Sequence, residues 1–288
     1  MIWLSYAITF GVIKMKIRKT CLSSLPALTF AWMLAGVAEA HDPVFGVGPH
    51  VLYKDGVEVH LGVHQEKSDD RDTEAEFEIK YGITGDWVAG VGTSYFRTGA
   101  HSGSEDGRGP SSLFTKYRFW RHDTFGAQDS AAILAKVIFD DGDSSHGAKR
   151  DGNDYLLGLT YGYEGRKWYR WASVRHRFNA KTEAGLERLN VWLVDLVGGI
   201  RFSPTEYQEP DWVWMLELNG EIIEHVSQAV GTAEKKLGGE QWFLSPGLMW
   251  TYRNFAFKAG VQLPVFDDLS ADQDVDDYRA LIELEWHL

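Results

Sequence analysis

Apolar and polar residues alternate along most of the chain after residue 40. The stretch GVEVHLGVHQ at 56–65 has valine or leucine at every second position, with charged, imidazole or glycine residues between them. The stretch EAEFEIKYGI at 74–83 repeats this arrangement with Ala, Phe, Ile and Tyr. A period of two residues is typical of a β-strand with one apolar and one polar face. No sustained helical periodicity accompanies it, so the pattern predicts an all-β protein.

The same rule predicts twelve strands, most of them about 10 residues long. A tilted strand needs about 9–11 residues to cross the hydrocarbon of a bilayer, whereas strands in soluble proteins average about 5 or 6. The predicted lengths therefore favour a protein that crosses a membrane with strands. The predicted strands are 56–65, 74–83, 87–97, 112–122, 130–139, 154–163, 168–178, 188–202, 211–225, 240–252, 255–263 and 277–288.

The connections between these strands alternate in length. Short turns at one end and long polar loops at the other, joining an even number of strands, are typical of a bacterial outer-membrane barrel. We therefore predict a transmembrane antiparallel up-and-down β-barrel of about 12 strands, with both termini in the periplasm. The short connections are 84–86, 123–129, 164–167, 203–210 and 253–254, and the long ones are 66–73, 98–111, 140–153, 179–187, 226–239 and 264–276.

A secreted soluble β-sandwich also alternates, and it is the alternative fold. Its interior would have to bury the large residues of every strand at once. It also has no need for aromatic residues at strand ends, although Trp and Tyr collect at membrane–water interfaces. The chain contains 12 Trp, and the aromatic residues at predicted strand ends include Trp87, Tyr95, Trp168, Trp212 and Trp286.

The last predicted strand, DYRALIELEWHL at 277–288, has no unpatterned tail after it. Its apolar positions alternate with charged ones as far as Leu288, and only Leu281 interrupts the pattern. We predict that this strand closes the barrel against the first one, because a strand edge cannot stay unpaired in hydrocarbon. The terminus also resembles the C-terminal signal read by the barrel-assembly machinery, although Leu288 stands where that signal usually has an aromatic residue. The residues expected to face lipid are Tyr278, Ile282, Leu284, Trp286 and Leu288.

Residues 1–40 have the features of a secretory signal peptide. Basic residues precede the apolar run LSSLPALTFAWMLAG, which ends at the small-residue motif Ala38-Glu39-Ala40. We expect cleavage before His41, with either Met1 or Met15 as the start. A transmembrane anchor is the alternative, but the run is shorter than a span of about 20 residues. The predicted organisation is a removed signal peptide (1–40), a periplasmic N-terminal segment (41–55) and an outer-membrane β-barrel (56–288).

Charge and cysteine content exclude several classes of function. Without residues 1–40 the chain has 25 basic and 40 acidic residues, a net charge of −15. Such a surface repels nucleic acid, so no nucleic-acid partner is expected. The single cysteine, Cys21, lies in the segment expected to be removed, which excludes disulfides and thiolate chemistry in the mature chain.

In a barrel surrounded by lipid, the apolar face of each strand meets hydrocarbon and the opposite face lines the lumen. The lumen candidates carry charges of both signs. Either these side chains pair across a plugged lumen in a structural barrel, or they line a path for a small polar or amphipathic solute. The candidates are Glu58, His60, His64, Glu76, Glu78, Lys80, Lys116, Arg118, Lys136, Arg175, Arg177, Glu217, Lys258, Arg279, Glu283 and Glu285, with Asn219 and Gln262 beside them.

The stretch WYRWASVRHRF at 168–178 fits the barrel pattern least well. One choice of face exposes Arg170 and His176 to lipid, and the other exposes Arg175 and Arg177. A lipid-facing arginine costs about 2–4 kcal/mol at the bilayer midplane but only about 0–1 kcal/mol near an interface. We therefore expect Arg170 to lie near the turn, at the level of the lipid headgroups.

The residues give little support for a metal site or for catalysis. An N-terminal His41 could bind a divalent metal through its amine and imidazole, but an exposed terminus is the simpler interpretation. His60 and His64 share a strand face at roughly 13 Å, too far apart to chelate one ion alone. No G-x-S-x-G or H-E-x-x-H motif is present. We predict no cofactor and no enzyme activity; the alternative is an outer-membrane lipid hydrolase that would use His122 or His176.

The sequence HDPVFGVGPHVLYKDGVEVHLGV at 41–63 resembles the start of a family of Gram-negative outer-membrane transporters associated with the meta-pathway of phenol degradation. The similarity is most specific in HDPVFGVGPH. The resemblance implies an outer-membrane β-barrel, expected to be a channel or transporter for aromatic or other small organic solutes. It supplies no catalytic or binding residues. The expected partners are outer-membrane lipids, lipopolysaccharide around the acidic outer loops, the barrel-assembly machinery and the solute.

Overall fold

The computed structural model describes residues 41–288, with gaps at 69–70, 101–102, 144–149, 183–187, 206–207, 231–232 and 271–274. The predicted signal peptide lies outside the described residues. The described residues form strands, turns and irregular segments, and no helix long and apolar enough to cross a membrane occurs among them.

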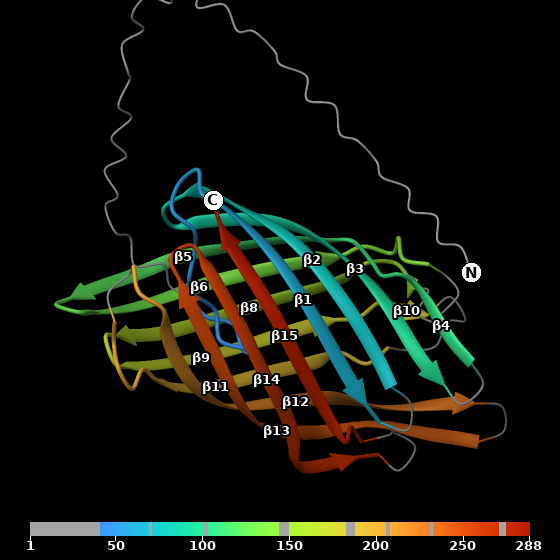
Figure 1. Cartoon of the computed structure of the whole chain (residues 1–288). Helices are drawn as coiled ribbons and strands as arrows, with labels where there is room; N and C mark the ends of the chain where they lie inside the picture. Colours follow the sequence, from blue (N-terminus) through green and yellow to red (C-terminus); the bar gives the residue numbers. More distant parts are fainter. Residues whose placement is uncertain are drawn as a thin grey trace, which may run out of the picture. The chain divides into compact units, whose positions relative to one another are not determined.

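Twelve antiparallel strands form a closed barrel, as the alternation of the sequence predicts (Figure 1). Each strand pairs with the next barrel strand along the chain, and β15 (Tyr278–His287) pairs with β1 (Val57–Lys67) to close the ring. The other barrel strands are β2 (Arg71–Thr84), β3 (Trp87–Ala100), β5 (Ser112–Thr124), β6 (Ala127–Ile138), β8 (Asp154–Gly165), β9 (Trp168–Phe178), β11 (Val191–Ile200), β12 (Asp211–Val230), β13 (Ala233–Tyr252) and β14 (Phe255–Leu269).

Three short strands lie outside this ring and were not predicted. β4 (Gly103–Arg108) pairs with the end of β3 inside a predicted loop. β7 (Arg150–Asp151) and β10 (Lys181–Thr182) form a two-stranded sheet between two other long loops. Their residues, GSEDGR, RD and KT, are polar or glycine, so the sequence gives no period-two signal for them.

The prediction of a loop at 226–239 is wrong. β12 and β13 continue as a paired hairpin over this region, and their register shifts between Ile223 and Val226. Backbone hydrogen bonds extend the two strands past the length needed for a membrane. The sequence there, VSQAVGTAEKKLGG, has no sustained alternation of apolar and polar residues, and such a sequence predicts a loop equally well.

The barrel has two ends that differ in their connections. We call the end with the short connections at 85–86, 125–126, 166–167 and 253–254 the turn end, and the opposite end the loop end. Both the start of β1 and the end of β15 lie at the turn end, where Val57 and Leu288 exchange two backbone hydrogen bonds.

The outward face of the barrel is apolar, and aromatic residues such as Trp87 and Tyr155 are exposed near strand ends. In β9, Arg170 and His176 lie on the outward side of the strand, where Arg170 is exposed and His176 is buried against Phe178 and Trp192. Arg170 is the third residue of the strand, next to the turn as expected, and its guanidinium lies 4.7 Å from the centre of the Tyr163 ring. His176 lies near the loop end, so neither polar side chain is at mid-strand.

One register shift places two aromatic residues on the same face. The pairing of β5 with β6 shifts between Arg118 and Trp120, which leaves Phe119 as an extra residue. Phe119 and Trp120 are consecutive, yet both are exposed on the barrel. A β-bulge of this kind lets two neighbouring side chains face lipid where a regular strand would turn one of them inward.

Residues 41–50 lie inside the barrel, towards its turn end, and we call them the plug. The sequence predicts a periplasmic segment at 41–55, but His41, Val44 and His50 are buried among inward side chains of the strands. The plug brings apolar residues into contact with an apolar patch of the lumen wall. The cluster consists of Val44, Tyr169, Trp171, Val197, Val213, Met215, Met249 and Leu281, with Phe45 packed against it.

Candidate functional site: the lumen and its plug

A single carboxylate holds the centre of the plug. Glu217, on β12, is completely buried and accepts hydrogen bonds from three consecutive backbone N–H groups. The distances are 2.8 Å from Val44 N, 3.2 Å from Phe45 N and 2.8 Å from Gly46 N. Hydrogen bonds to a charged acceptor are about twice as strong as neutral ones, so this residue fixes the path of the plug backbone.

Side chains from two further strands bind the rest of the plug. Lys116 Nζ, on β5, lies 3.1 Å from the Asp42 carboxylate and donates to the carbonyl oxygen of Gly48 at 2.9 Å. Thr160 Oγ1, on β8, donates to the carbonyl oxygen of Val47 at 2.7 Å. The plug is therefore tied to strands on several sides of the barrel.

Two glycines make room for the apolar part of the plug. Gly247 on β13 pairs with Gly260 on β14. A Cβ added at Gly260 would lie 2.7 Å from Phe45 Cε2 and 2.9 Å from Val44 Cγ1, and one at Gly247 would lie 2.8 Å from Val44 Cγ2. These contacts are closer than carbon atoms pack, so a side chain at either position would push the plug away.

Two titratable groups of the plug, Asp42 and His50, have shifted pKa values. Burial by itself raises the pKa of Asp42, but the nearby ammonium groups of Lys116 and Lys80 outweigh it and lower the pKa to about 2. Burial lowers the pKa of the His50 imidazole to about 3, against the opposing effect of Asp42. His50 is in contact with the Glu164 carboxylate, to which its neutral ring can donate.

A cavity of about 850 Å³ extends from the plug towards the loop end. Val44 and Phe45 contribute to its inner surface, whereas Glu66, Asp72 and Thr98 line it near the long loops. A second cavity of about 30 Å³ is lined by plug residues together with lumen residues near the turn end. The plug thus lies between the large cavity, which extends towards the loop end, and the small cavity, which its own residues help to line.

Charged side chains of both signs line the large cavity, and several form ion pairs. Lys258 Nζ lies 2.8 Å from Glu283 and 2.6 Å from Glu285. Arg279 binds Glu221 at 2.5 Å. The acidic lining residues are Asp42, Glu66, Asp72, Glu74, Glu76, Glu78, Asp195, Glu221, Glu283 and Glu285, and the basic ones are Lys80, Lys136, Arg175, Arg177, Lys258 and Arg279.

The structure places the predicted lumen residues in three groups. Glu58 and Lys116 line the small cavity, whereas Glu217 and Arg118 line neither cavity. Glu217 binds the plug, and Arg118 binds the Asp86 side chain at 2.8 Å by the turn after β2. The remaining twelve all line the large cavity: His60, His64, Glu76, Glu78, Lys80, Lys136, Arg175, Arg177, Lys258, Arg279, Glu283 and Glu285.

Sequence reasoning missed the apolar part of the lumen. It assigned every apolar face to lipid, yet Trp171, Met215 and Leu281 point inward and contact the plug cluster. One signal was present, because Leu281 interrupts the alternation of the last strand. An apolar residue at a lumen position indicates an apolar partner inside the barrel, and here that partner includes Val44.

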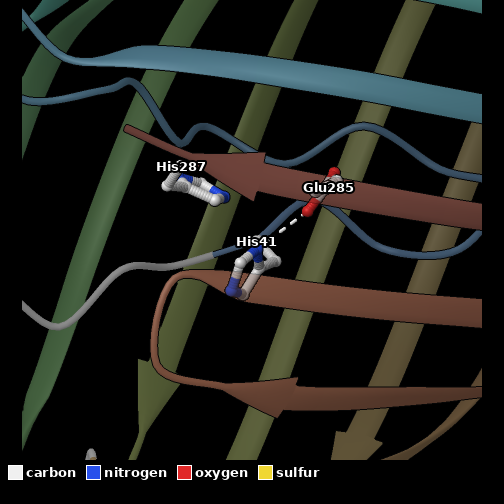
Figure 2. Close-up of side chains that lie close together, drawn as sticks. All are labelled: His41, Glu285 and His287. Carbon is white, nitrogen blue, oxygen red and sulfur yellow. Dashed lines mark hydrogen bonds and ion pairs between the residues drawn. The ribbon is translucent and has the colours of Figure 1, made fainter. Parts of the chain in front are cut away.

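His41, Glu285 and His287 lie close together near the turn end (Figure 2). His41 Nδ1 is 2.8 Å from Glu285 Oε2, and the His41 and His287 rings meet edge to face at 4.9 Å between centroids. All three residues are buried. No motif or periodicity of the sequence joins His41 with the end of the chain.

Neither histidine considered for catalysis has a serine as a hydrogen-bond partner among the described residues. His122 is exposed and stacks on Trp120. His176 Nε2 lies 3.2 Å from the Glu224 carboxylate and packs on Trp192. These contacts fit structural roles at the two ends of the barrel.

The sequence matches no known protein family and no curated protein. Solved structures do resemble the barrel. An outer membrane channel from Pseudomonas putida F1 has 9% sequence identity and a TM-score of 0.59, and the match covers 86% of this chain and 100% of the channel. The NanC porin is 11% identical with a TM-score of 0.48, over 81% of this chain and 100% of the porin. The similarity to the Pseudomonas protein supports the β-barrel fold of this chain. The resemblance to the phenol meta-pathway family is not confirmed.

Proposed function

We propose that the protein is an outer-membrane channel that admits a small solute into its lumen from the loop end. The cavity of about 850 Å³ between the loop end and the plug supports this proposal most directly. Cavities of about 300–1,000 Å³ are typical of small-molecule sites. The apolar outward face and the predicted signal peptide support a location in a Gram-negative outer membrane, with lipopolysaccharide around the loop end.

The cavity lining favours a solute that carries charge. Carboxylates and basic side chains line it together, and apolar residues such as Phe96, Ile138 and Leu193 lie among them. A zwitterion, or a small aromatic compound with an amine or carboxylate group, would find partners for both its charged and its apolar parts. An uncharged aromatic solute would displace water from the charged groups without offering them a polar partner.

Reconstitution in lipid bilayers and liposomes tests transport. We expect small single-channel conductance and swelling of liposomes in small amphipathic solutes, because the plug narrows the lumen. A barrel that is silent in both measurements would contradict the channel. Release of fatty acid from phospholipid or lipopolysaccharide would identify the barrel as a lipid hydrolase instead.

A structural barrel with a plugged lumen is the second candidate. The observation that favours it is the pairing of lumen charges, since Lys80 lies 2.7 Å from Glu58 and Arg175 lies 2.6 Å from Asp195. In a channel, these charged side chains would have to release one another in order to bind the solute.

A plug variant distinguishes the two candidates. Gly260→Val would displace Phe45 and Val44, whereas Gly198→Val is a matched control because no atom lies within 4 Å of a Cβ at Gly198. For a channel closed by its plug, Gly260→Val raises conductance and Gly198→Val does not. If the wild type and both variants show no conductance, the result favours the structural role.

A further inference from the structure

The two ends of the described chain meet in one buried cluster. His41 opens the plug, whereas Glu285 and His287 lie on one face of β15, the strand that closes the barrel. One ligand atom from each residue lies within 4.8 Å of the others. Figure 2 shows the His41 and Glu285 side chains directed at each other, with His287 beside them.

Two imidazoles and one carboxylate form a known type of metal-binding set. Zn²⁺ binds His nitrogen and Glu oxygen at about 2.0–2.2 Å, and two His with one Glu, plus an open fourth position, is a recurrent arrangement. Tetrahedral ligands at that bond length lie about 3.5 Å apart. The three ligand atoms lie within 4.8 Å of one another, so side-chain rotation can bring the wider pairs to this spacing while it lengthens the 2.8 Å contact of His41 with Glu285.

The surroundings hold the ligands in place. Glu285 uses one oxygen, Oε1, to bind Lys258 at 2.6 Å, while its other oxygen faces His41. Glu58 Oε2 lies 3.6 Å from His287 Nε2, so a second carboxylate borders the cluster. Partners outside the ligand set are general features of metal sites, because they orient the ligands and tune their basicity.

From this geometry we propose that His41, Glu285 and His287 form a binding site for a divalent transition-metal ion of the Zn²⁺ type at the turn end of the lumen. The site goes beyond solute passage and does not depend on it. Cleavage before His41, as the sequence predicts, would add the α-amine of His41 as a fourth donor, beside two imidazole nitrogens and one carboxylate oxygen. The bound ion would fasten the start of the mature chain to its last strand.

The alternative is a cluster held by hydrogen bonding alone. His41 Nδ1 and Glu285 Oε2 already lie at 2.8 Å, a normal hydrogen-bond length, and this contact by itself would anchor the plug. The two possibilities differ in metal uptake and in the effect of removing His287, which lies beside this contact.

Metal titration of the mature full-length barrel, purified from outer membranes in detergent and treated with chelator, tests the site. We expect one Zn²⁺ per chain by calorimetry. Co²⁺ should give the visible absorption bands of a tetrahedral site. Loss of one ligand in His41→Gln or His287→Gln is expected to weaken Zn²⁺ binding by at least about 10-fold, the lower end of the effect of removing even an outer-shell partner.

His64→Gln is the matched control, because His64 is also a lumen histidine beside a carboxylate, 3.7 Å from Glu76, and lies outside the cluster. Heat-modifiable migration in gel electrophoresis verifies that each variant is folded. If His287→Gln fails to fold, the Zn²⁺ affinities of His41→Gln and His64→Gln are compared instead, and a lower affinity in His41→Gln supports the site. Absence of stoichiometric Zn²⁺ in the wild type, or equal affinity in His41→Gln and wild type, would overturn the proposal.

Discussion

At the scale of single residues, Glu217 shows how one buried carboxylate organises a segment far away in sequence. Its oxygens accept from the N–H groups of Val44, Phe45 and Gly46, and Val44 is 173 positions away along the chain. Asn219 lies beside it, with Nδ2 at 3.4 Å from Glu217 Oε2. Removal of the carboxylate would leave the plug N–H groups buried without an acceptor, which is costly in free energy.

We predict that Glu217→Ala releases the plug. A hydrogen bond to a charged group contributes about 1.5–3 kcal/mol, and loss of even one such bond corresponds to at least about 10-fold in the docking equilibrium. Hydrogen–deuterium exchange at residues 44–46 should therefore be at least about 10-fold faster than in the wild type. Glu217→Gln keeps one acceptor oxygen and should have a smaller effect. Unchanged exchange in Glu217→Ala would show that apolar packing alone holds the plug.

His50 makes docking of the plug dependent on pH. Its pKa is about 3 in the docked state, against 6.5 for a free imidazole, so the undocked state binds more protons between these values. Docking is therefore at full strength above pH 6.5 and is lost progressively as the pH falls towards 3. The charged or titratable groups near His50 are Asp42, Glu164, Lys116, Arg118 and His41.

We predict that the plug exchanges faster at pH 5 than above pH 7, by at most about 30-fold after correction for intrinsic exchange, because His50 binds one extra proton on undocking. His50→Gln does not titrate in this range and should remove most of the difference. The same acceleration in His50→Gln and wild type would assign the pH dependence to another group.

At the scale of elements, β15 closes the barrel and also contributes side chains to the lumen. Its outward residues Ile282 and Leu284 are exposed on the barrel, as predicted, and Trp286 stacks on Phe255 at 5.7 Å. Leu288 exchanges backbone hydrogen bonds with Val57, and its carbonyl oxygen accepts from Tyr53 Oη at 2.7 Å. The strand end is thus fixed to the first strand and to the segment after the plug.

We predict that deletion of residues 286–288 abolishes membrane insertion. The truncation leaves Val57 and Val59 without partners on one edge, and an unpaired edge cannot persist in hydrocarbon. The measurement is heat-modifiable migration of the outer-membrane fraction. Leu288→Phe, which supplies the aromatic end that the assembly machinery usually reads, should insert at least as well as the wild type. Normal heat-modifiable protein from the truncation would refute this account of the terminus.

At the scale of the whole molecule, the charges of the large cavity are not balanced. Carboxylates outnumber Lys and Arg side chains in its lining, ten to six. A cleft in a low-dielectric wall concentrates the field of such an excess and attracts ions of the opposite sign. The mature chain as a whole is also acidic, with 40 acidic and 25 basic residues predicted after cleavage.

We predict that the proposed channel prefers cations over anions. The reversal potential across a KCl gradient near 0.1 M measures this, since screening is weaker there than at 1 M, where the Debye length is about 3 Å. Glu74→Gln together with Glu76→Gln removes two lining charges near the loop end and should reduce the preference. Anion selectivity of the wild type would contradict the prediction.

The sequence by itself determined the barrel. Every second residue of a strand in hydrocarbon faces lipid and must be apolar. The alternation that results identified all twelve barrel strands, and for β9 it identified both the first and the last residue. The same rule placed Glu217 and Lys258 on the inward side, because parity is a local property. The requirement for alternating apolar residues applies only where a strand lies in hydrocarbon. The extensions of β12 and β13 and the three short strands show no such alternation, so the sequence did not predict them.

Only the tertiary structure decided what fills the barrel. The plug depends on contacts such as that of Val44 with Glu217, and the cluster of His41 with Glu285 joins residues 244 positions apart. No periodicity encodes such pairs, because they depend on barrel closure and on the strand registers that place Gly260 opposite Gly247. The sequence therefore specifies the strands of the barrel wall, because each must present apolar residues to lipid. The contacts inside the lumen form only when the barrel has closed around the plug.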